Sequence, residues 1–168
     1  ESSTLTNLGL ISRKRGERSE AKRLFLQSLA IDVEIGDKEG EVNSRHTLSR
    51  LALADGDIVT AERLCQEALS ISIDINDLLG KGKSIFQLGS IAQNRGDLDK
   101  AEGLFNDCLE INRQIGALES VGSALHSLGS ISKTRGNISK ALHLFEESLE
   151  ISKSMGNLDA SALALLSI

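Results

Sequence analysis

Apolar residues recur along the chain at the spacing of one face of an α-helix. In the segment 101–115 they are Ala101, Leu104, Phe105, Cys108, Leu109, Ile111 and Ile115. At about 100° per residue these side chains fall within an arc of about 160°, which predicts a helix with one broad buried face. A similar stripe precedes it at Ile85, Leu88, Ile91 and Ala92. Gly96 and Asp97 lie between the two stripes and suit a helix end and the N-cap of the next helix. The pattern predicts two helices of about 17 residues joined by a tight turn.

This helix pair repeats every 40 residues. The turn glycine recurs as Gly16, Gly56, Gly96 and Gly136, and five further positions are identical in all four copies. A second break recurs at Gly36, Asn76, Gly116 and Gly156, residues that tolerate a left-handed conformation. We expect one array over 1–168, with repeats at 1–36, 37–76, 77–116 and 117–156 and a truncated fifth repeat at 157–168. Because no pair can bury its stripes alone, the repeats must stack into an all-α fold.

The repeat resembles the tetratricopeptide repeat family in its Leu-Gly pair, small residue, aromatic residue and second small residue. The third copy has these as Leu88-Gly89, Ala101, Phe105 and Cys108. The second copy departs from the pattern with Ser49 and Cys65 where the others have Gly and Phe. The period of 40 rather than 34, and the absence of the terminal Pro, are similar to the long variants in kinesin light chains, cell-polarity adaptors and bacterial regulators. The resemblance implies a right-handed α-solenoid of antiparallel helix pairs, with a concave groove lined by the first helix of each pair.

Composition excludes several functions. The net charge of −5, with four Phe and no Trp or Tyr, argues against nucleic-acid binding. No apolar run reaches the roughly 18 residues of a membrane span. The chain begins without Met or a signal peptide, so we expect an excised segment of a cytoplasmic protein. Cys65 and Cys108 fall on core stripes, which predicts inert buried thiols. No residues have the spacing of a catalytic or metal site, so we expect no enzyme activity, no metal and no cofactor.

The first helices have a basic face opposite their core stripes. Its twenty positions contain five Lys or Arg, two His and no acid, although Glu39, Glu119 and Asp159 lie one or two turns earlier. By the resemblance this face lines the concave groove. The candidate peptide-binding residues are Arg13, Lys14, Asn43, His46, Arg50, Lys83, Phe86, Gln93, Asn94, His126 and Lys133. Charge-assisted hydrogen bonds would favour an acidic segment of a partner protein.

Two alternatives to this groove remain open. One is a sensing module that binds a small molecule or a short signalling peptide in a bacterial regulator, which would need a discrete apolar pocket. The other is end-to-end self-assembly through the apolar C-terminal segment, which would make the protein a homo-oligomer. The candidate residues for this contact are Leu163, Leu165, Leu166 and Ile168.

Overall fold

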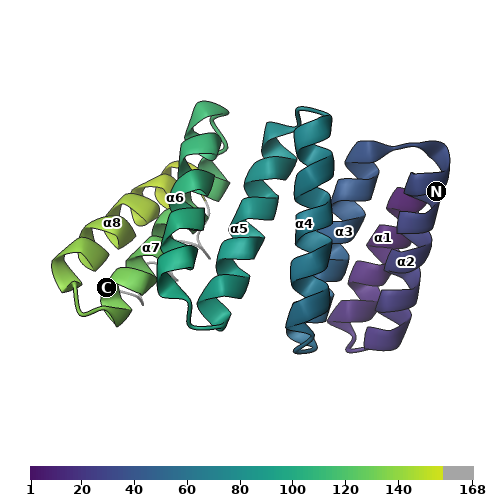
Figure 1. The fold of residues 1–168 in the computed structure, drawn as a ribbon, viewed down its shortest axis with the longest axis horizontal. Helices are drawn as coiled ribbons and strands as arrows, with labels where there is room; N and C mark the ends of the chain where they lie inside the picture. Colours follow the sequence, from purple (N-terminus) through teal and green to yellow (C-terminus); the bar gives the residue numbers. More distant parts are fainter. Residues whose placement is uncertain (157–168) are drawn as a thin grey trace. The chain divides into compact units, whose positions relative to one another are not determined.

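The computed structural model describes residues 1–156, which form eight helices and no strand (Figure 1). The helices are α1 (Ser2–Lys14), α2 (Arg18–Ile35), α3 (Lys38–Ala54), α4 (Ile58–Asp74), α5 (Leu78–Asn94), α6 (Leu98–Gln114), α7 (Leu118–Thr134) and α8 (Ile138–Ser154). The predicted all-α fold class is confirmed. The chain divides within α5 into two compact units, unit 1 (residues 1–84) and unit 2 (described over residues 85–156).

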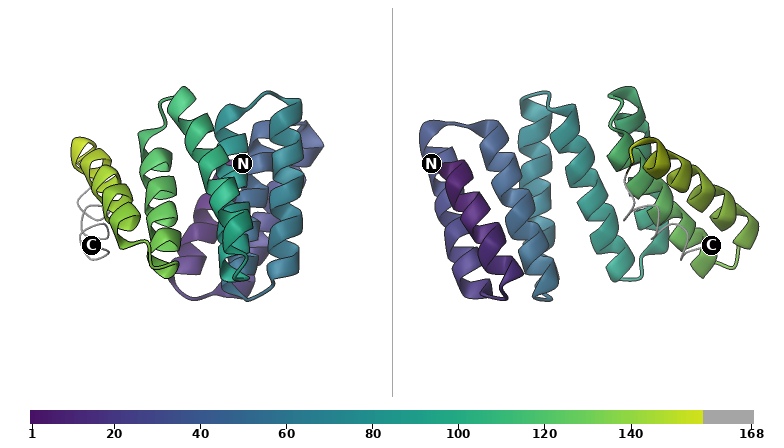
Figure 2. Two further views of the ribbon diagram at one scale, coloured as in Figure 1. Left: turned by 60° about the vertical axis from the view of Figure 1, so that its left-hand side comes forward. Right: turned by 180° about the vertical axis from the view of Figure 1, so that it is seen from behind.

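Local chemistry determines where the helices begin and end. Asp37, Asp57, Asp97 and Asn137 each accept a hydrogen bond from the backbone N–H three residues later, at 2.9–3.2 Å. Such caps satisfy donors that the first helical turn leaves unpaired. At the other break Asn76 has φ 55°, the one positive φ at a non-glycine residue in the described part of the chain. Consecutive helices pack side by side as α1 with α2, α3 with α4, and α7 with α8 (Figure 2).

Glycine and phenylalanine meet where the two helices of a repeat pack. A Cβ atom on Gly9 would lie 2.4 Å from Phe25 Cε1, and one on Gly129 would lie 2.6 Å from Phe145 Cε1. Any larger residue at these glycines would therefore clash with the ring. The second repeat replaces both partners at once. The side chain of Cys65 is smaller than the phenylalanine ring of the other repeats, and the side chain of Ser49 occupies the space that this difference leaves. Ser49 Oγ donates a hydrogen bond to the Ala61 carbonyl at 2.8 Å.

Each second helix also buries one polar residue near its C-terminal end. In α2 this residue is Asp32, which is 1% exposed and accepts hydrogen bonds from Ser2 Oγ and Ser44 Oγ. Eighty residues later Asn112 takes the place of Asp32, and Ala124 takes the place of Ser44. Asn112 Nδ2 donates to the Cys108 carbonyl at 2.7 Å, whereas Asn112 Oδ1 has no hydrogen-bond partner among the described residues.

Two core-stripe positions hold exposed residues: Leu8, which shares the repeat position of the stripe residue Leu88, and Ile115. Leu8 is 46% exposed, whereas Leu48 and Leu128 at the same repeat position are 5% and 4% exposed. Leu48 packs in the core cluster of Ala21, Phe25, Leu51 and Leu64, which includes residues of the preceding helix α2. Within residues 1–156 Leu8 has no such preceding helix packed against it. Ile115, also placed on a stripe, is 36% exposed because it is the C-cap residue of α6 and lies beyond its last helical turn.

Candidate functional site

Four cations lie on the predicted face of unit 1, and three of them, Arg13, Arg50 and Lys83, act on the pKa of Arg50 or of His46. Arg13 near the end of α1 is half-buried, and Arg50 in α3 and Lys83 in α5 are exposed. Within residues 1–156 none of the three forms an ion pair. Burial and the positive charge of Arg13 lower the pKa of the Arg50 guanidinium, so the two side chains repel each other. These three residues are called the unit 1 basic cluster below.

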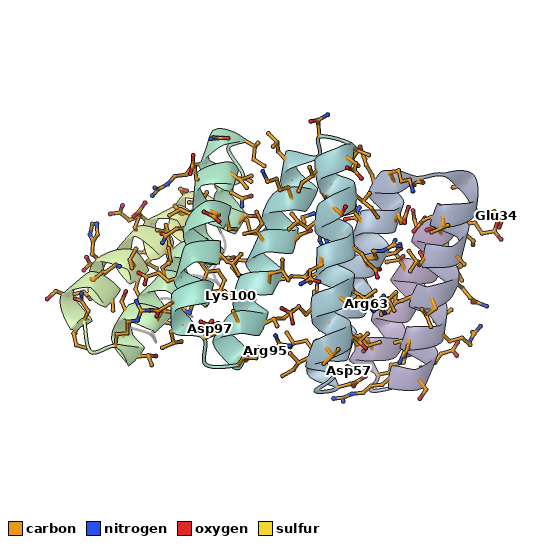
Figure 3. The ribbon with its side chains drawn as sticks, viewed as in Figure 1. Glu34, Asp57, Arg63, Arg95, Asp97 and Lys100 are labelled. Carbon is orange, nitrogen blue, oxygen red and sulfur yellow. The ribbon has the colours of Figure 1, made fainter. Side chains whose placement is uncertain are left out.

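Other cations of unit 1 are neutralised by acids. Arg18, Arg23, Arg45 and Arg63 each bond a carboxylate, at 2.5–3.1 Å. Charged residues also cover the second helices, where Arg63 lies on α4 and Lys100 on α6, and Asp57 and Asp97 cap the starts of these helices (Figure 3). The basic cluster therefore differs from these four arginines in having no ion pair within residues 1–156.

His46 is buried rather than exposed to a ligand. Its side chain is 5% exposed, and Nε2 lies 2.7 Å from Ser84 Oγ, which donates to the Gly80 carbonyl at 2.9 Å. Since the Ser84 proton is used there, the ring donates from Nε2 to Ser84. Burial, assisted by the charges of Lys83 and Arg50 and opposed by Asp77, lowers the pKa of His46 to about 4. The neutral ring is packed in the interior beside the basic cluster, so the proposed binding surface does not include it.

The remaining predicted residues of unit 1 lie at its edges. Lys14 is exposed at the last residue of α1, and Asn43 is exposed one turn before His46 in α3. The sequence pattern thus placed these side chains on the surface correctly. Their role in binding stays a prediction.

Unit 2 has a cavity of about 280 Å³ beside two predicted residues, Phe86 and His126. The Phe86 ring packs on Phe105 at 5.3 Å between centroids, and the His126 ring packs on Phe145 at 5.2 Å. Burial lowers the pKa of His126, which favours its neutral form. Ile151 of α8 and Met155, the C-cap residue of α8, complete the wall. We call this space the α7–α8 cavity.

The other predicted residues of unit 2 do not line this cavity. Gln93 is half-buried near the end of α5, and Asn94 and Lys133 are exposed near the ends of α5 and α7. The proposed self-association residues, from Leu163 to Ile168, lie outside the described residues. The structure therefore brings Phe86 and His126 together in unit 2 and leaves the other predicted residues of that unit apart from them.

Sequence reasoning missed the contribution of the second helices. It counted only first-helix positions, whereas Ile151 of α8 and its C-cap residue Met155 line the α7–α8 cavity. It also missed a cavity of about 380 Å³ in unit 1, which has leucines at its base and charged residues such as Lys22 and Asp55 at its rim. All four repeats have an isoleucine at the position of Ile151, which was the available signal. The sequence pattern assigned this position to the core.

The remaining chemistry agrees with buried thiols. Cys65 and Cys108 are fully buried and form no disulfide with each other, and burial raises the pKa of each thiol to about 11. The predicted burial of both cysteines is confirmed. Within residues 1–156, no group of His, Cys, Asp and Glu is arranged to hold a metal ion, and no helix is both long and apolar enough to cross a membrane.

Comparison with known proteins gives a family and a fold. The tetratricopeptide repeat model matches residues 1–74 and 84–154. No curated protein matches the sequence. Among solved structures, aspartyl phosphate phosphatase F from Bacillus subtilis superposes with a TM-score of 0.89 at 13% identity, over 99% of this chain and 44% of the phosphatase.

Two further structures have the same fold. A putative kinesin light chain from Podosopora anserina has a TM-score of 0.71 and 19% identity, with 98% of this chain and 85% of that one covered. A Rap protein complexed with competence and sporulation factor has a TM-score of 0.83 and 14% identity, with 97% and 46% covered. The chain thus spans less than half of the phosphatase and of the Rap protein.

Proposed function

Because the chain belongs to the tetratricopeptide repeat family, we propose that it is a non-enzymatic module that binds a peptide segment of a partner protein on its first helices. We further propose that unit 1 prefers an acidic segment. A Rap protein with a similar fold has been solved in complex with competence and sporulation factor. This similarity supports a binding role for the chain, because the same helix-pair architecture holds a partner in the Rap protein.

The observation that carries the acidic preference is the unit 1 basic cluster. Arg13 lies close enough to Arg50 for its charge to lower the Arg50 pKa, and Lys83 adds a third cation without a carboxylate partner in residues 1–156. Like charges gathered in this way repel each other, so a bound carboxylate lowers the free energy of all three. Arginine can bind a carboxylate through two parallel hydrogen bonds, which adds direction to the attraction.

The buried neighbour of the cluster gives independent support. The charges of Lys83 and Arg50 both act to lower the pKa of His46, against an opposing effect of Asp77, so these two cations contribute a positive potential at the ring. An anion bound at the cluster would weaken that potential. Helices held by neighbouring helices also form the cluster before the ligand arrives, so the entropic cost of ordering falls mainly on the peptide.

A peptide-display experiment tests this proposal. A random library is panned against the protein at low and moderate salt, and binding of the enriched peptides is measured by fluorescence anisotropy. The test variant is Arg13→Gln/Arg50→Gln/Lys83→Gln. We expect peptides rich in Asp and Glu, and a loss of affinity of about tenfold or more in the variant, which is about 0.5 kcal/mol for each charge.

The matched control is Lys22→Gln/Arg23→Gln/Arg63→Gln. It removes the same three charges from exposed positions on α2 and α4 of unit 1. We expect this control to weaken binding less than about twofold, because screening limits distant charges. The proposal is wrong if the enriched peptides are not acidic, or if both triple variants lose affinity equally.

A further inference from the structure

The α7–α8 cavity has hydroxyl groups whose protons are already used. Ser123 Oγ donates to the Glu119 carbonyl at 3.0 Å, and Ser127 Oγ donates to the Ser123 carbonyl at 3.0 Å. Ser148 Oγ donates to the Gly122 carbonyl at 2.8 Å, and Ser152 Oγ donates to the Ser148 carbonyl at 3.0 Å. A hydroxyl has one proton and two lone pairs. These four oxygens can therefore only accept hydrogen bonds from a ligand.

The charge of the cavity also favours a ligand that donates hydrogen bonds. Among its described lining residues Glu119 carries the single charge, and it is exposed at the start of α7. His126 contributes a neutral ring with one N–H, because burial lowers its pKa. The cavity thus offers a carboxylate and several acceptor oxygens, against one donor. A ligand carboxylate would meet repulsion, whereas a cation with several donors would be satisfied.

The rest of the wall is apolar. Phe86 contributes an aromatic ring, Ile151 a branched chain and Met155 a flexible thioether. A volume of about 280 Å³ lies at the lower end of ligand sites and is large enough for one long side chain. The ligand therefore needs a hydrocarbon stem that ends in a hydrogen-bond-donating cation.

We propose that the α7–α8 cavity binds a lysine side chain presented by the peptide segment of a partner protein. The four methylenes pack against Phe86, Ile151 and Met155, and the three ammonium protons bond to Glu119 and the serine oxygens. Arginine suits the cavity less well, since its planar fork needs acceptors in one plane. The proposal rests on peptide binding as the function, and it adds a second specificity that is independent of the unit 1 basic cluster.

The protein supplies its own reporter for this cavity. Met155 is the single methionine of the chain, so labelling with ¹³C-methyl methionine gives one methyl resonance at the site. Three blocked tripeptides serve as probes, Gly-Xaa-Gly with lysine, norleucine or glutamate in the middle. We expect a saturable methyl shift with the lysine peptide, about threefold or weaker affinity for norleucine, and no shift with glutamate.

Two substitutions with matched controls test the contacts. Glu119→Gln should weaken the lysine peptide about threefold, to the level of norleucine, while Glu39→Gln at the same repeat position in unit 1 should change nothing. Gly122→Leu should abolish binding, because its side chain would enter the cavity. The first atom of that side chain meets only ordinary contacts, with Ile151 Cγ2 3.6 Å away. Gly103→Leu is the control, because a Cβ atom there meets nothing within 4 Å.

The outcomes separate this proposal from the proposed function. Equal affinity for lysine and norleucine, or unchanged lysine binding in Glu119→Gln, would overturn the lysine assignment and leave acidic-peptide binding by unit 1 untouched. Absence of any methyl shift at millimolar peptide would overturn it as well. Loss of acidic-peptide binding together with retained lysine binding would refute the unit 1 proposal alone.

Discussion

His46 should make the stability of the protein depend on pH where few other side chains titrate. Its ring is 5% exposed and bonded to Ser84, and its pKa is lowered from 6.5 to about 4. In the unfolded chain the ring takes up a proton as the pH falls through 6.5, whereas in the folded chain it stays neutral until about pH 4. Between these values unfolding binds a proton, so acidification favours the unfolded chain.

The size of the effect follows from the two pKa values. His46 contributes its full stabilisation above pH 6.5 and loses it as the pH falls toward 4. The complete loss corresponds to about 3 kcal/mol, and about 2 kcal/mol of it is lost by pH 5. Neighbouring charges act in both directions, since Lys83 and Arg50 oppose protonation and Asp77 favours it, but burial is the largest cause.

Two measurements check this prediction. An NMR titration of the His46 ring proton gives the folded pKa directly, and urea unfolding at pH 7.5 and pH 5 gives the free energy of unfolding for wild type and His46→Gln. Glutamine can still donate to Ser84 but does not titrate. We expect wild type to lose about 2 kcal/mol more than His46→Gln over this interval. His143→Gln, at an exposed position on α8, is the control and should behave as wild type.

The comparison removes the contributions of other groups. His126 also has a lowered pKa and acts in the same direction, and its contribution is present in both proteins. The lowered pKa of Glu41 and Glu102 places their losses below about pH 4.5, outside the interval. A folded His46 that titrates near 6.5, or equal losses in wild type and His46→Gln, would refute the reasoning.

Two further substitutions test the packing of single repeats by urea unfolding. Ala124→Ser should raise the free energy of unfolding by about 1 kcal/mol, because the new hydroxyl can donate to the unpaired Asn112 Oδ1; an unchanged or lower value would contradict this. Cys65→Phe should cost about 1–3 kcal/mol, because the ring meets Ser49, and adding Ser49→Gly should restore most of the loss. Additive effects of the pair would show that the two positions do not compensate each other.

The sequence predicted what local chemistry determines. Caps and breaks depend on residues within one turn, so the roles of Asp97 and Asn137 as N-caps could be identified without the fold. The face of a helix likewise follows from its period, which correctly placed Ala101 and Phe105 in the core. Leu8 shows the limit of the same reasoning, because its exposure depends on a neighbouring helix and not on its own period.

The candidate sites depended on contacts between helices, which the sequence pattern does not contain. His46 was assigned to the surface because it lies opposite the core stripe of α3. It is buried because Ser84, 38 residues later, lies against its ring. The α7–α8 cavity was missed for a similar reason, since a count along first helices cannot include Ile151 of α8 or its C-cap residue Met155.

One repeat position shows how a common backbone can carry different chemistry. His46, Phe86 and His126 follow one another at intervals of 40 residues. His46 has Ser84 as its hydrogen-bond partner and is sealed in the interior of unit 1. The residue 38 places after Phe86 is Ala124, which has no hydroxyl, and Phe86 instead packs on Phe105 and borders a cavity. The repeat determines the backbone position of each side chain. Residues of the following repeat determine whether that side chain is buried in the core or lies at a binding surface. Repeats that share a fold can therefore acquire separate ligand preferences through single substitutions in their neighbours.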